Sequence, residues 1–210
     1  MPLNRIATAA FRTIGAVDSV HGSSALEAQF TGRQGKIVRP CSGFDRFLRL
    51  DSPRGIDSNG VRKPNVQAAN VAAIVPPIDH GGARTHPGDG AWLECNHVTI
   101  PAGSALRFHW GFLRFDGLPG NDFCAFEPEG EPLVTLAQIF DLEMRGNANQ
   151  TRGPGGHVWI EHVWKPSGGF SGRLRWIVAN AELVLSASDP PTGLEFVRPS
   201  AMVLCGLDIS

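Results

Sequence analysis

Residues 106–126 read LRFHWGFLRFDGLPGNDFCAF, and they contain the clearest structural signal in the chain. In the first half, bulky apolar residues occupy every second position, at Leu106, Phe108, Trp110 and Phe112. Side chains of a β-strand point alternately to its two faces, so this spacing predicts a strand with one buried face. The turn-forming residues GLPGND (117–122) then predict a reversal before the aromatic residues resume.

Strand-like runs recur through the second half of the chain. HVWIEHVW (157–164) alternates, RLRWIVANAELVL (173–185) alternates more loosely with a bulge or turn expected at Ala179–Asn180, and the almost wholly apolar SAMVLCGLDI (200–209) resembles a central strand. PLVTLAQIFDLEMRG (132–146) favours a strand with a short helical turn. Segments rich in glycine and proline separate these runs. The pattern predicts an all-β fold, an antiparallel β-sandwich or jelly roll.

The first ninety residues differ from the rest in having short apolar runs among many Gly, Pro, Asn and Arg residues. We expect residues 1–91 to form a loop-rich extension with edge strands, within the same domain as a sandwich core at 92–210. An arm that packs against a neighbouring subunit is the alternative. A chain of 210 residues suits one large domain of this kind.

Charge and hydropathy exclude several classes of partner. The net charge is −1 and basic residues are scattered, which argues against nucleic-acid binding. No apolar run approaches the roughly 20 residues that a membrane-spanning helix requires. The N-terminus lacks the apolar centre of a secretory signal, so we expect a cytoplasmic protein, one exported by a leaderless route, or one whose leader has been removed.

The four cysteines are far apart and form no CxxC pair. Three of them, Cys95, Cys124 and Cys205, lie in apolar strand-like runs, so buried free thiols are the first expectation. One or two disulfides among these three and Cys41 are the alternative, and the spacing cannot assign any pairing.

Acidic residues in two regions of the chain are candidates for a calcium site. Asp116, Asn121 and Asp122 surround the turn in the opening stretch, and calcium prefers carboxylate, amide and carbonyl oxygens. An Asn-Asp pair that orders the turn through side chain to backbone hydrogen bonds is the alternative. Asp208 lies in an apolar run, where a carboxylate must be exposed, hydrogen-bonded or bound to a cation.

Aromatic and titratable side chains in 157–164 form a candidate ligand site. His157, Trp159 and Glu161 share one strand face with Val163, whereas Trp164 lies on the other. His157 and Glu161 could act as an acid-base pair, and the two tryptophans could stack on sugars. Core packing is the alternative for these tryptophans. A second titratable group, His80 and His86 in the loop DHGGARTHPGDG (79–90), could ligate a transition metal or simply be solvated.

The order of these features resembles bacterial jelly-roll modules of the carbohydrate-binding superfamily. The matching parts are W-x₅-VTIPAG (92–103), FHWGFLRFDGLPGNDFCAF (108–126), GRLRWIVANA (172–181) and PSAMVLCGLDI (199–209). The resemblance implies a sandwich that is often secreted or surface-anchored, with Asp208 and secondarily Asp122 facing a structural calcium ion.

We therefore expect a non-enzymatic binding or assembly module that contacts a glycan or a protein. A structural subunit of a virion or secretion particle is the first alternative, and it predicts a large homo-oligomer. A hydrolase is the second, either metal-dependent through His80 and His86 or using His157 with Glu161.

Overall fold

A computed structural model describes the following segments of the chain. These are residues 11–21, 24–25, 37–38, 40–51, 55–56, 62–63, 68–113, 120–140, 159–186 and 200–210. Nothing in them is a helix long and apolar enough to cross a membrane.

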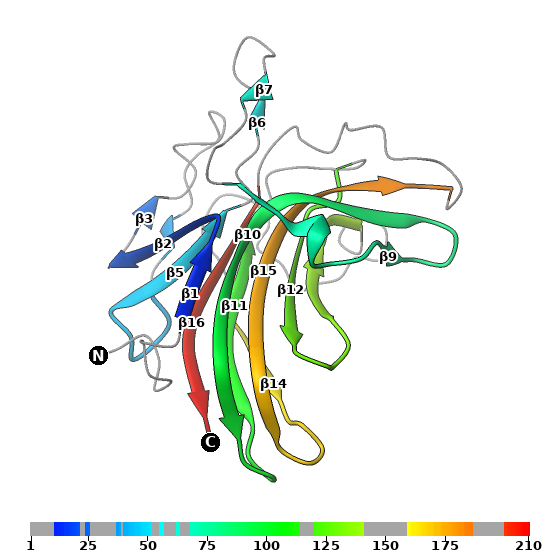
Figure 1. Cartoon of the computed structure of the whole chain (residues 1–210). Coiled ribbons are helices and arrows are strands. Elements are labelled where there is room, and N and C mark those ends of the chain that lie inside the picture. Colours follow the sequence, from blue (N-terminus) through cyan, green and yellow to red (C-terminus); the bar gives the residue numbers. More distant parts are fainter. Residues whose placement is uncertain are drawn as a thin grey trace.

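Within these segments, two antiparallel sheets contain the long strands (Figure 1). The seven-stranded sheet runs in the order β1 (Phe11–Ile14), β10 (Arg84–Ile100), β15 (Phe170–Val184), β12 (Phe123–Pro128) and β13 (Val134–Gln138), and β8 (Ala69–Asn70) and β9 (Ile78–Asp79) also pair with β10. The five-stranded sheet runs in the order β14 (Ile160–Trp164), β11 (Leu106–Leu113), β16 (Ala201–Ile209), β5 (Arg46–Asp51) and β2 (Ala16–His21). The smaller elements are the ladders β3 (Ser24–Ala25) with β4 (Ile37–Val38) and β6 (Gly55–Ile56) with β7 (Arg62–Lys63), and the 3₁₀ turn η3 (Val71–Ala73).

The main core fills the space between the two sheets, as the alternation of apolar residues predicts. Phe108 on β11 contacts Phe126 on β12, with ring centroids 5.1 Å apart, and meets Trp176 on β15 edge to face at 5.6 Å. All three side chains are fully buried. Aromatic contacts of this geometry add to the free energy gained from apolar burial. The predicted all-β sandwich is therefore confirmed.

A second apolar cluster covers the outer face of the five-stranded sheet. It contains Phe47 and Val203 together with Cys41 and Cys205, which form a disulfide. The expectation that all four cysteines are free thiols is wrong for this pair. Spacing could not reveal the pair, because the bond joins residues 164 positions apart across a loop and a strand. Cys95 and Cys124 are buried free thiols, as expected.

Most strand predictions agree with the observed elements. β16 is central in its sheet, and β13 is followed by two helical residues, 139–140. The bulge expected at Ala179–Asn180 is misplaced. β15 is continuous there, and the extra residue lies opposite on β10, between Pro87 and Gly90.

Several strands of the first ninety residues belong to the two large sheets, namely β1, β2, β5, β8 and β9. β1 is an edge strand of the seven-stranded sheet, and β2 is an edge strand of the five-stranded sheet. Gly15, with φ of 80°, is the single residue between them, so the chain passes from one sheet to the other at this point. β10 itself crosses the expected boundary between residues 91 and 92.

Candidate functional site

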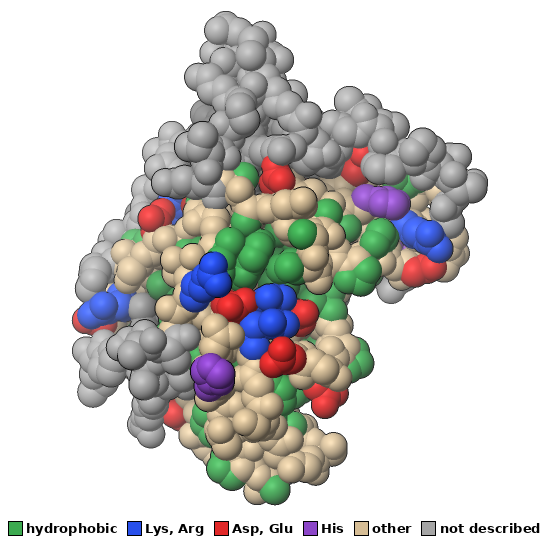
Figure 2. All heavy atoms as spheres, in the orientation of Figure 1, with side chains coloured by type: hydrophobic (Ala, Val, Ile, Leu, Met, Phe, Trp, Pro, Cys, Tyr) green, Lys and Arg blue, Asp and Glu red, His purple; other side chains and the backbone are tan. Residues whose placement is uncertain are grey.

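Charged side chains gather on the outer face of the seven-stranded sheet. Leu93 and Cys95 on β10 point into the main core, so Glu94 between them points outward, and Arg175 on β15 is outward by the same alternation. Figure 2 shows acidic and basic side chains together in the middle of this face, next to a hydrophobic patch.

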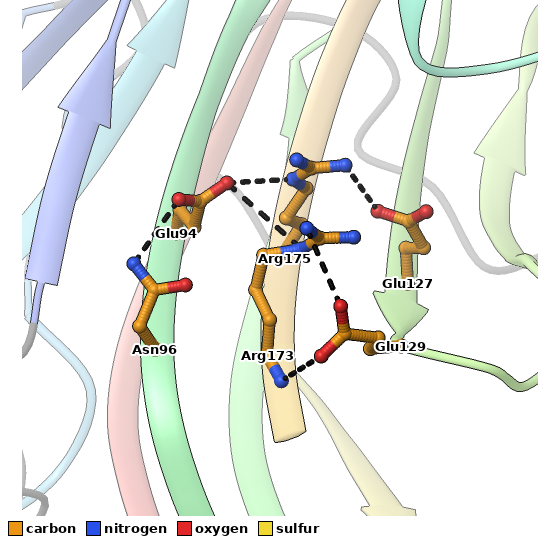
Figure 3. A network of polar contacts seen from close by, with 6 residues as sticks. All are labelled: Glu94, Asn96, Glu127, Glu129, Arg173 and Arg175. Atoms are coloured by element: carbon orange, nitrogen blue, oxygen red, sulfur yellow. Dashed lines mark hydrogen bonds and ion pairs between the residues drawn. The ribbon is translucent and has the colours of Figure 1, made fainter.

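Six residues form one polar network across β10, β15, β12 and the turn that follows β12 (Figure 3). We call them the platform: Glu94, Asn96, Glu127, Glu129, Arg173 and Arg175. Arg175 is central, because its Nε donates to Glu94 at 2.8 Å and its guanidinium NH1 donates to Glu127 at 3.1 Å. Asn96 donates to the other oxygen of Glu94 at 3.2 Å. Arg173 pairs with Glu129 at 3.6 Å and lies 4.0 Å from Glu94.

The network holds Glu94 in its charged form. Burial alone would raise the pKa of the Glu94 carboxyl, but the hydrogen bonds from Arg175 and Asn96 and the charges of Arg175 and Arg173 outweigh it and lower the pKa. The side chain of Glu94 is only 9% exposed, whereas that of Arg173 is 27% and that of Glu129 is 51% exposed. Glu94 and Arg175 therefore form the fixed base of the platform, and Arg173 and Glu129 are its accessible part.

The lowered pKa of Glu94 makes stability depend on pH. A carboxyl whose folded pKa lies below its unfolded value stabilises the fold above the unfolded pKa, and this contribution is lost as the pH falls through the folded pKa. We expect Glu94→Gln to cost about 1–2 kcal/mol of unfolding free energy at pH 7. In urea titrations, that difference should shrink as the pH falls below about 4.5. A difference unchanged at low pH would contradict the assignment.

An apolar cluster borders the platform on the same face. Trp92 and Ile177 follow the outward alternation of Glu94 and Arg175, and Val71 of η3 packs against the same cluster. Trp92 is half-buried, and its indole N–H has no hydrogen-bond partner in the part of the chain that the structure describes. The platform therefore combines planar polar groups with an indole ring two residues away on β10.

Asn121, a predicted calcium ligand, is the centre of a buried hydrogen-bond cluster. Its side-chain amide donates to Thr85 and, at 3.4 Å, to Gln138, and its carbonyl oxygen accepts from the backbone N–H of Phe140. Asn121 and Thr85 are fully buried. These contacts tie the segment before β12 to β10 and to the end of β13. Residues 117–119 of the turn lie outside the described residues, so ordering of the turn by Asn121 and Asp122 stays a prediction.

The structure separates the two carboxylates named by the resemblance. Asp122 directly precedes β12, and its side chain accepts from the backbone N–H of Ala181 at 3.2 Å. Asp208 is near the end of β16, at the opposite end of the sandwich from Asp122. It lies directly across the ladder from Arg107 of β11. Asp116 lies outside the described residues. No group of three or more His, Cys, Asp or Glu side chains suited to a metal ion occurs among the described residues. Calcium stays a prediction.

The predicted ligand residues of 157–164 do not form one surface. Trp164 is half-buried and packs edge to face on Phe126 and Phe170, with centroids 5.6 and 5.0 Å apart. Trp159 contacts Phe47 at 6.1 Å in the cluster on the outer face of the five-stranded sheet. Glu161 is exposed and pairs with Arg107 at 3.4 Å. His157 lies outside the described residues, so ligand binding by these four residues stays a prediction.

The histidines of the 79–90 loop have separate surroundings. His80 makes a 2.7 Å hydrogen bond to Thr85 and stacks on Phe140 at 5.0 Å. His86 is on β10, opposite Glu182. The hydrogen bond of His80 extends the buried cluster around Asn121, so this side chain helps to fix the loop.

Sequence reasoning missed the platform because it followed aromatic and histidine residues. A signal is present, since the segments WLECN, GRLRW and FEPE place charged or amide residues at every second position. Such alternation identifies outward-facing residues, but it cannot say which strands are neighbours. Here the acidic strands β10 and β12 lie on either side of the basic strand β15, and only the sheet order shows this.

The fold and the platform thus define an antiparallel β-sandwich with a charged surface on one outer face. No family model matches the chain, and no curated protein matches it. Among solved structures, the chain is similar to one titled "CBM4 structure and function", with 8% identity, a TM-score of 0.30, and coverage of 77% of this chain and 93% of that one.

It is also similar to the C-terminal CBM6 of LamC, a marine laminarinase from Zobellia galactanivorans, with 11% identity and a TM-score of 0.28. That match covers 93% of this chain and 98% of the other. Similarity at these TM-scores is too low to transfer a function, so the proposal below depends on the geometry of this chain.

Proposed function

We propose that the protein is a non-catalytic binding module and that its platform binds a carbohydrate. The observation that carries this proposal is the network of planar polar side chains around Arg175, set beside the half-buried Trp92 on the same sheet face. Carboxylate, guanidinium and amide groups can exchange paired hydrogen bonds with adjacent sugar hydroxyls, and an indole ring offers an apolar surface to a sugar ring.

Charge balance argues against other ligand classes. The platform has three carboxylates and two guanidinium groups, and the exposed Arg12 of β1 is the cross-strand neighbour of Glu94. A surface with nearly equal numbers of opposite charges does not attract a polyanion strongly. The cores of protein–protein interfaces are depleted in charged residues, whereas the centre of the platform is charged. An uncharged polyhydroxyl ligand fits this surface best.

The lowered pKa of Glu94 argues against a role for this carboxyl as a general acid. A general acid requires a pKa near the working pH, and glycosidases raise the pKa of their acid to reach it. The pKa of Glu94 is shifted in the opposite direction, because two arginines and Asn96 hold the carboxylate charged. The Cys41–Cys205 disulfide supports an oxidising location for the module.

Arg173→Ala should weaken carbohydrate binding at least about tenfold, because it removes a charged donor from the accessible part of the platform. Isothermal titration against a panel of soluble neutral polysaccharides measures this. Arg107→Ala is the matched control, since Arg107 is 45% exposed and pairs with Glu161 on the other sheet. Equal losses in both variants, or no binding by the wild type to any polysaccharide, would contradict the proposal.

A further inference from the structure

β14 is one of the two edge strands of the five-stranded sheet, and within the described residues it pairs only with β11. An edge strand presents backbone N–H and C=O groups that can pair with a further strand. The exposure of β14 alternates, with Glu161 and Val163 outward and exposed, and with His162 and Trp164 half-buried on the inner face. Val163 is 43% exposed, and among the described residues only Leu185 is another large apolar side chain in the exposed class.

The sequence of this strand is complementary to itself. In IEHVWK (160–165), Glu161 and Lys165 lie two residues on either side of Val163. If two copies pair antiparallel about Val163, Glu161 of each copy faces Lys165 of the other. Lys165 is exposed, as Glu161 is. Opposite charges directly across an antiparallel pair stabilise it, and like charges destabilise it.

The inner-face side chains of the two copies are also complementary in this register. His162 of one copy faces Trp164 of the other, so two half-buried rings on each strand gain a ring neighbour. Both rings already pack on the core, since His162 lies 5.0 Å from Phe108 and Trp164 lies 5.6 Å from Phe126 between centroids. Pairing would therefore cover ring surface that the monomer leaves partly exposed, and cross-strand aromatic pairs add stability.

We propose that β14 is a dimerisation edge, at which two copies of this chain pair antiparallel about Val163 and join their five-stranded sheets. The interface is isologous, as expected for a twofold dimer, because each copy offers the same strand to the other. It lies on the sheet that does not carry the platform, so dimerisation leaves both platforms accessible and gives a bivalent molecule.

A charge exchange tests both the interface and its register. In a dimer of the Glu161→Lys variant, lysine would face lysine at both symmetry-related positions. In a dimer of the Lys165→Glu variant, glutamate would face glutamate at both positions. Each should weaken dimerisation at least about tenfold. The double variant Glu161→Lys/Lys165→Glu restores both opposite-charge pairs and should dimerise like the wild type. Arg107→Ala controls for the ion pair that Glu161 makes within the monomer.

Sedimentation velocity across micromolar to submillimolar concentrations gives the readout, and circular dichroism of each variant checks that the fold is retained. We expect a species of twice 22.5 kDa for the wild type and the double variant, and monomers for the two single variants. Three results would overturn the proposal: a monomeric wild type, single variants that remain dimeric, or a double variant that does not recover the dimer.

Discussion

Gly90→Ala should destabilise the protein by about 3 kcal/mol or more, or prevent it from folding. A methyl group at this position would lie 2.0 Å from the backbone carbonyl oxygen of Val178 and 2.9 Å from a methyl of Val71. Gly90 follows the bulge in β10, where β10 and β15 approach closely and η3 packs over them. Backbone atoms in the middle of a sheet cannot move aside without breaking ladder hydrogen bonds on both strands.

Gly168→Ala is the control for this effect. Gly168 is exposed in the turn before β15, and an added methyl group would meet no atom within 4 Å. We expect its unfolding free energy to stay within about 0.5 kcal/mol of the wild type. Urea unfolding followed by tryptophan fluorescence measures both variants. A Gly90→Ala protein as stable as Gly168→Ala would show that β10 and β15 do not approach as described.

Loss of the Cys41–Cys205 disulfide should cost about 3–5 kcal/mol of unfolding free energy. The bond joins residues 164 positions apart, so it restricts the unfolded chain strongly. Both cysteines are at least 95% buried and pack with Phe47 and Val203 on the outer face of the five-stranded sheet. Their replacement therefore also removes apolar contacts that hold the loop at Cys41 against β16.

Reduction separates the disulfide from these packing effects. Dithiothreitol should lower the urea midpoint of the wild type and leave the Cys41→Ser/Cys205→Ser variant unchanged. Thiol titration of the unfolded, unreduced wild type should find two free thiols, from Cys95 and Cys124. Four free thiols would contradict the pairing, and so would equal responses of both proteins to the reductant.

The alternation of apolar residues was sufficient to predict the class of fold and several strands. β11 and β14 agree with it because one face of each packs on the core, and the almost wholly apolar β16 is central because apolar clusters cover both its faces. The predicted bulge was misplaced because an irregularity in a ladder can lie on either strand, and Ala179–Asn180 pairs next to the extra residue of β10. Local sequence does not show which partner contains the insertion.

The site was harder to predict than the fold. Glu94, Arg175 and Glu127 come from three strands whose order in the sheet depends on long-range pairing. Trp164, an aromatic residue that was suited to a ligand by its sequence position, packs on the core instead. Burial of large rings contributes strongly to the stability of a sandwich. The buried hydrogen bonds of Asn121 could not be predicted either, because Thr85, Gln138 and Phe140 lie 17 to 36 positions away along the chain.

The claim that the platform binds a carbohydrate is tested most directly by a ¹H–¹⁵N NMR titration with a neutral polysaccharide that the protein binds. We predict that the largest shifts come from the side-chain amide of Asn96, the Nε–H groups of Arg173 and Arg175, and the indole N–H of Trp92. Residues on the outer face of β14 should be unaffected. Shifts centred on Trp159 and Glu161, with the platform unchanged, would contradict the account.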